Sequence, residues 1–123
     1  MTFWYLATPY SKYHAGLEAA FEMACLQRAL FVKARIPCFC PIVHSHAVAH
    51  HGGLDKLDLS IWLPDDAPFM ALAKGLVVVK AHGWQESYDI QQEIIVFTER
   101  KKPIYFMELG IIPIDILCGP VPK

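Results

Sequence analysis

The run Leu76-Val77-Val78-Val79 is the most apolar short stretch of the chain, and it leaves few folds open. A short, continuous run of such residues is typical of a strand that is buried on both faces of a sheet. A turn at Gly83-Trp84 follows it, and then a segment with helical spacing from Asp89 to Arg100. We therefore expect the chain to pass here from the carboxyl end of a buried strand into a helix, where open α/β sheets bind ligands.

Strand and helix patterns alternate along the rest of the chain. Apolar runs bounded by turn residues predict strands, and apolar residues three or four apart predict helices. The expected strands span residues 3–8, 38–43, 76–81 and 103–106, and the clearest helices span 14–34, after a Ser11 cap, and 89–100. This order favours an α/β fold in one domain over residues 1–123: a three-layer Rossmann-like (flavodoxin-like) sandwich with a mostly parallel 4–5-stranded sheet.

Two regions are expected to be less regular. A loop should run from residue 44 to about residue 58, and long loops in a compact domain are often functional. Two short helices should follow, with Pro64 breaking the first and Asp65 or Asp66 capping the second. The tail is expected to add an edge strand at residues 111–117 or to cover a neighbour.

The composition narrows the classes of partner. Apolar residues make up 54% of the chain, more than in an average soluble domain, so we expect both sheet faces to be covered or subunits to associate as a homo-oligomer. The net charge of −1, without a block of like charge, argues against a nucleic-acid polymer as partner. Without a run of 18 apolar residues, no membrane span is expected.

The cysteine pattern indicates a reducing compartment rather than a disulfide framework. Their spacing fits no disulfide framework, and the first residues have no basic region of a signal peptide, so we expect reduced thiols in the cytoplasm. Cys38-Phe39-Cys40 is expected to hold buried free thiols, with a metal clip as the weaker alternative. The glycine-rich motifs of dinucleotide sites and P-loops are missing from the sequence, and no cofactor is expected.

Glu93 is the best candidate for a reactive group. It lies near the start of the helix expected after the apolar strand, where a carboxylate is stabilised in its charged form. Such a carboxylate can act as a nucleophile on a sugar carbon or as a general base, and Tyr5 or Tyr10 could orient it by a hydrogen bond. The alternative is that Glu93 is a solvated residue of the helix N-terminus.

Three further clusters carry polar chemistry. Tyr10-Ser11, before the long helix, could hold a phosphate or a ribose hydroxyl on free backbone N–H groups. A helix cap accounts for only one carboxylate of Asp65-Asp66, and the other could face the same crevice as Glu93. A histidine group could hold a substrate or a phosphate, act as acid and base, or bind zinc with Asp55 or Asp58; its spacing matches no known zinc motif, and we favour a loop or substrate contact. Its members are His44, His46, His50 and His51.

These motifs, in this order, resemble a known superfamily. The segments are Tyr5–Ser11 (Y-L-A-T-P-Y-S), Pro41–His46 (P-I-V-H-S-H), Trp62 with Asp66, and Gly83-Trp84-x-x-Ser87 with Glu93. Together they span nearly the whole chain and resemble the nucleoside 2-deoxyribosyltransferase-like superfamily. More closely, they resemble a small bacterial family of unknown function within it.

The resemblance implies roles for individual residues. Glu93 would attack C1′ of a deoxynucleoside to give a glycosyl-enzyme ester, Tyr5 would orient it, and Asp66, or by a one-residue ambiguity Asp65, would handle the leaving base. Contacts to the nucleoside-like or nucleotide-like ligand would come from Thr8, Pro9, Tyr10, Ser11, His44, His46, Gly83, Trp84 and Ser87.

The chain departs from the transferases at the sugar site. Ser87 stands where they usually have Asp, and Asp89 where they usually have Gly. Hydrolysis of a nucleoside or nucleotide, and binding of a nucleotide-like or sugar-phosphate ligand without catalysis, are therefore as compatible as transfer. A metal-dependent hydrolase built on the histidines is a third hypothesis.

Overall fold

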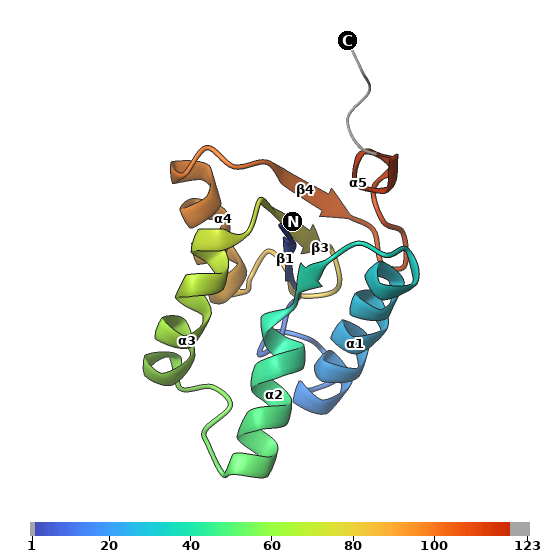
Figure 1. Cartoon of the computed structure of the whole chain (residues 1–123). Helices are drawn as coiled ribbons and strands as arrows, with labels where there is room; N and C mark the ends of the chain where they lie inside the picture. The colour runs from blue at the N-terminus through green and yellow to red at the C-terminus, as the bar shows by residue number, and fades with distance from the viewer. Residues whose placement is uncertain (1, 119–123) are drawn as a thin grey trace.

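The computed structural model describes residues 2–118 and shows a parallel sheet between two layers of helices (Figure 1). The strands lie in the order β2-β1-β3-β4 and all neighbours pair in parallel. The strands are β1 (Trp4–Ala7), β2 (Cys38–Phe39), β3 (Gly75–Val79) and β4 (Ile104–Met107). The helices are α1 (Leu17–Lys33), α2 (Pro41–Gly52), α3 (Leu59–Leu72), α4 (Tyr88–Glu99) and α5 (Ile114–Cys118). The predicted three-layer α/β class is therefore confirmed.

The two central strands, β1 and β3, are buried along their whole length, which explains their continuous apolar runs. Alternate side chains point to opposite faces of the sheet. Leu6 and Val77 join the core under α1, whereas Leu76 and Val78 join the core under α3 and α4. Figure 1 shows α1 on one side of the sheet, with α3 and α4 on the other.

The structure corrects the region predicted as a strand ending at residue 43 and a following loop. β2 ends at Phe39, and α2 begins at Pro41, a residue whose fixed φ suits the first position of a helix. Gly53 ends the helix in the left-handed conformation, with φ 69°. The histidines therefore lie on a helix, and the intervals between them set which face each occupies.

The structure also replaces the two short helices with one. α3 is continuous through Pro64 and Pro68, and its cap is Asp58, whose side chain accepts a hydrogen bond from the Ser60 N–H at 3.0 Å. Asp65 and Asp66 therefore do not cap a helix. A proline inside a helix removes one hydrogen bond, and we attribute the tolerance of both to the burial of Trp62 and Met70 on the sheet-facing side.

Two other boundaries differ from the prediction. α1 starts at Leu17 after Gly16, and Ser11 does not cap it. The tail forms the short helix α5 instead of an edge strand, and Ile116 of that helix packs on the core under α1. Among residues 2–118, no helix is long and apolar enough to cross a membrane.

Candidate functional site

A cleft opens where α2, α3 and α4 meet the carboxyl end of β1. Its deeper part, which we name the inner chamber, has a volume of about 200 Å³. Its floor and walls include Tyr5, Thr8, Trp62, Asp66, Asp89 and Glu93. The outer chamber, of about 190 Å³, shares Trp62, Asp66 and Asp89 with it and adds Tyr10, Ser11, Ser45 and Lys56. The fold thus places residues from four separate elements around one cavity.

Glu93 lies at the bottom of the inner chamber. It stands on the second turn of α4, faces the sheet and is only 8% exposed. Burial raises the pKa of its carboxyl to about 8, and the nearby Asp89 and Asp66 add to the rise, while the Tyr5 hydroxyl opposes it. Glu93 is therefore not the solvated helix residue of the alternative interpretation.

Tyr5 reaches the same point from β1. Its side chain is fully buried, and burial together with Glu93 and Asp66 raises the pKa of its phenol well above the ordinary value. The hydroxyl lies close enough to Glu93 to lower the pKa of its carboxyl as a hydrogen-bond donor does, although the contact falls outside ideal hydrogen-bond geometry. The Tyr5 hydroxyl is therefore placed to donate to Glu93, the carboxyl beside it.

Asp66 approaches from α3 on the opposite wall. Its Oδ1 is buried and also has no hydrogen-bond partner among the described residues. Burial, followed by the charges of Asp65 and Asp89, raises the pKa of Asp66 to about 7. Asp66 thus brings an unpartnered oxygen to the chamber that Tyr5 and Glu93 line, where a ligand with a hydroxyl or amino group would satisfy it.

Asp89 completes a group of three carboxyls in the inner chamber. It precedes Glu93 by one helical turn, and burial raises its pKa. No Lys, Arg or His side chain lines this chamber among residues 2–118. The three carboxyls therefore have no cationic partner in this chamber, and burial raises the pKa of each of them. In the sequence, Asp89 stands out only as a departure from the transferases; its spacing of four residues from Glu93 predicts that both occupy one face of a helix.

Trp62 forms an apolar wall of both chambers. Its indole N–H donates to the carbonyl of Asp55 at 2.8 Å, which fixes the orientation of the ring. Tyr88, at the first turn of α4, also lines both chambers and is 58% exposed. The outer-chamber Lys56 is a cleft residue that the sequence interpretation did not assign to the site.

Several residues predicted to contact the ligand do not line the cleft. Ser87 is buried, and its hydroxyl accepts a hydrogen bond from the Ile90 N–H at 3.3 Å as the cap of α4. Gly83 and Trp84 line a separate, open hollow with Lys12. Gly83 has φ 87°, and a side chain there would clash with the backbone of Lys12. Gly83 therefore lets the loops after β1 and β3 approach each other closely.

The remaining predicted contacts differ in where they lie relative to the two chambers. Thr8 lines the inner chamber, whereas Tyr10 and Ser11 line the outer chamber. Pro9 is fully buried and lines neither chamber. His44 is half-exposed and pairs with Asp65 at 3.5 Å, beside the cleft rather than in it.

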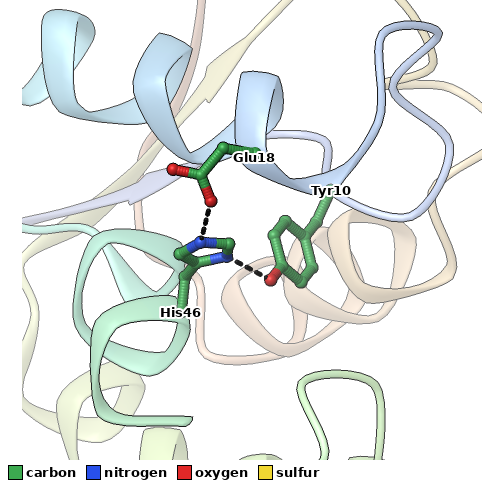
Figure 2. A network of polar contacts seen from close by, with 3 residues as sticks. All are labelled: Tyr10, Glu18 and His46. Carbon is green, nitrogen blue, oxygen red and sulfur yellow. Dashed lines mark hydrogen bonds and ion pairs between the residues drawn. The ribbon is translucent and has the colours of Figure 1, made fainter. Parts of the chain in front are cut away.

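His46 lies behind the cleft, within a chain of hydrogen bonds (Figure 2). Its Nδ1 is 2.6 Å from the Tyr10 hydroxyl, and its Nε2 is 2.9 Å from a Glu18 oxygen. His50 and His51 pack edge-on against each other nearer the surface. The described residues contain no group of three or more His, Cys, Asp or Glu side chains that could hold a metal ion, so the histidine metal-site hypothesis has no ligand set there.

The fold and the cleft define an α/β domain with a buried acidic pocket at the carboxyl end of a parallel sheet. Comparison with known proteins then gives its family. The chain belongs to the family described as Domain of unknown function (DUF1937), whose model matches residues 2–109. That range includes every residue of the cleft. The search of curated proteins found no match to this chain.

Proposed function

We propose that the protein is an N-glycosidic enzyme that cleaves a nucleoside or nucleotide through a covalent ester on Glu93. The observation that carries the proposal is the meeting of Glu93, Tyr5 and Asp66 in one small, mostly apolar chamber. The chemistry needs one carboxylate to attack the anomeric carbon and one carboxylic acid to protonate the leaving group. The resemblance to the nucleoside 2-deoxyribosyltransferase-like superfamily assigns the same roles to the same residues.

In the first step, a Glu93 oxygen forms a bond to C1′ while the bond between C1′ and the base nitrogen breaks. The electron pair of that bond stays on the base, which takes the proton of Asp66. Tyr5 donates a hydrogen bond that holds the attacking carboxylate in place. In the second step, water or another base attacks C1′ and releases the Glu93 carboxylate. The two-step route lowers the barrier at the anomeric carbon.

Base release from deoxynucleosides and deoxynucleoside monophosphates tests this proposal. Glu93→Gln keeps the size of the side chain but removes the nucleophile, so base release should fall by at least about a hundredfold. Glu99→Gln is the matched control, because Glu99 lies on the same helix and is exposed. Equal rates in the wild type and Glu93→Gln, with Glu99→Gln also equal, would contradict the proposal.

One observation favours a second candidate function, the binding of a nucleotide-like ligand without turnover. The pKa of Glu93, raised to about 8, keeps most of the carboxyl protonated at pH 7, and a protonated carboxyl is a poor nucleophile. A binding protein of this kind would be stabilised thermally by deoxynucleosides, would release no base, and would retain that stabilisation in Glu93→Gln.

We also propose that the protein forms a homo-oligomer and resides in the cytoplasm. Ile111, Ile114 and Leu117 near α5 are exposed, and Phe106 on the edge strand β4 is 46% exposed, which leaves apolar surface for a second copy. The free state of all four cysteines is consistent with a reducing compartment. Light scattering that showed only monomer at micromolar concentration would contradict the oligomer.

A further inference from the structure

The hydrogen-bond chain of Tyr10, His46 and Glu18 joins three segments that are distant in sequence. Tyr10 follows β1, Glu18 is in the first turn of α1, and His46 is on α2. The two bonds measure 2.6 Å and 2.9 Å (Figure 2). His46 is 4% exposed, and its ring stacks on Phe21 with 4.3 Å between ring centroids. The imidazole is therefore held in one orientation by two hydrogen bonds and one stacked ring.

The partners of His46 fix the direction of the hydrogen bonds. The Glu18 carboxylate can only accept, so Nε2 of His46 must donate to it. In neutral His46, Nδ1 is then left to accept, and the Tyr10 hydroxyl must donate to it. The order of hydroxyl, imidazole and carboxylate is the order in which a triad passes a proton from a hydroxyl to a histidine that a carboxylate orients.

The two ends of the hydrogen-bond chain, Tyr10 and Glu18, have different surroundings. Tyr10 lines the outer chamber together with Ser11, Ser45 and Lys56. Glu18 has a side chain that is 71% exposed, and it lines a surface hollow with His46, His50 and His51. Because the O–H of Tyr10 is committed to His46, the remaining lone pair of its oxygen can only accept a hydrogen bond. A ligand or water O–H in the outer chamber fits that acceptor.

We propose that Tyr10, with His46 and Glu18 as positioning residues, is the general base that activates the water which resolves the glycosyl-Glu93 ester. This proposal rests on the proposed function. Water loses a proton to the Tyr10 oxygen and forms a bond to C1′, while the bond between C1′ and the Glu93 oxygen breaks. Tyr10 passes its own proton to Nδ1 of His46. The imidazolium that results is paired with the Glu18 carboxylate and later releases its proton to solvent through the surface hollow.

Burial and the charge of Glu18 raise the pKa of the Tyr10 phenol to about 12. A free phenolate at Tyr10 is therefore not populated at neutral pH, and proton transfer needs the histidine to take the phenolic proton in the same step. This is why the relay is required rather than the tyrosine alone.

Two matched substitutions on α1 distinguish proton transfer through Tyr10, His46 and Glu18 from a purely structural role of their hydrogen bonds. In Glu18→Gln the amide oxygen still accepts from Nε2 of His46, but the charge that stabilises an imidazolium is lost. Glu22→Gln makes the same change at an exposed position one turn further along the helix. With a deoxynucleoside that the wild type hydrolyses, Glu18→Gln should release a first equivalent of base at the wild-type rate. It should then turn over at least about tenfold more slowly, and Tyr10→Phe should do the same.

Glu22→Gln should match the wild type in both phases. The melting temperature of each variant shows whether the fold is retained. If Glu18→Gln and Glu22→Gln turn over equally, the relay is overturned, even when base release by the wild type confirms the enzyme. A slow first equivalent in Glu18→Gln also overturns it, because the relay acts only after the ester has formed.

A measurement that needs no turnover covers the case in which the protein cleaves no nucleoside. Nitrogen NMR of the histidine side chains in the free protein should show neutral His46 protonated at Nε2 and accepting at Nδ1. Tyr10→Phe should shift the Nδ1 signal, and Glu22→Gln should leave it unchanged. A proton on Nδ1 in the neutral form would reverse the hydrogen bonds and overturn the relay whatever the protein catalyses.

Discussion

At the level of single residues, the inner chamber is lined by buried carboxyls, and no Lys, Arg or His side chain among residues 2–118 lines it with them. Glu93, Asp66 and Asp89 all have raised pKa values, and burial is the first cause in each case. The sequence predicts Glu93 and Asp66 as site residues because of their place in the chain. It cannot predict the raised pKa values, since these depend on burial by α3 and α4 and on distances between residues that are far apart in sequence.

The raised pKa of Glu93 predicts how stability depends on pH. Between pH 4.5 and about 8 the folded protein retains a proton on Glu93 that the unfolded chain has released, so the free energy of unfolding falls as pH rises through this window. With a pKa of about 8 in the folded protein against 4.5 in the unfolded chain, the expected fall is on the order of 5 kcal/mol. Thermal melts from pH 5 to 8.5 should show it, and Glu93→Gln should have a shallower slope. Parallel curves for Glu93→Gln and the wild type would contradict the assignment.

At the level of helices and strands, the sequence predicts the elements that have regular apolar spacing and mispredicts those that contain many Pro and His residues. β1, β3, α1 and α4 are close to the predicted ranges. The sequence of α2 predicts a loop because His50, His51 and Gly52 are weak helix formers. In the structure, packing against α1 and β1 makes the segment helical. α3 reads as two helices because of Pro64, whose local cost is outweighed by tertiary contacts.

The cap of α4 gives a prediction at this level. Ser87 is buried and accepts a hydrogen bond from the Ile90 N–H, so Ser87→Ala should lower the free energy of unfolding by about 1 kcal/mol. Ser87→Asp supplies another capping oxygen and should retain more of the stability than Ser87→Ala does. Chemical denaturation curves measure both changes. If Ser87→Ala leaves stability unchanged but weakens ligand binding, the hydroxyl is a ligand contact, as the resemblance implies, rather than a cap.

For the whole molecule, the order of the strands places the site. From β1 the chain moves to β2 on one side and then crosses to β3 on the other side of β1, so the strand order switches between β1 and β3. In open α/β sheets, clefts form at the carboxyl ends of the strands on either side of such a switch point. The alternation of strands and helices is enough to predict this edge. It does not distinguish the α3 and α4 side, which holds Glu93, from the loop after β3, which holds Trp84, because that choice depends on which helices cover which face.

The most direct test of the proposed reaction is to look for the covalent ester itself. The protein is mixed with a deoxynucleoside, quenched in acid during turnover, digested and analysed by mass spectrometry. We predict that the peptide containing Glu93 gains the mass of one deoxyribosyl group, and that the adduct is missing from Glu93→Gln and retained in Glu99→Gln. Base release without any adduct on Glu93 in the wild type, or an adduct that persists in Glu93→Gln, would contradict the assignment of Glu93 as the nucleophile.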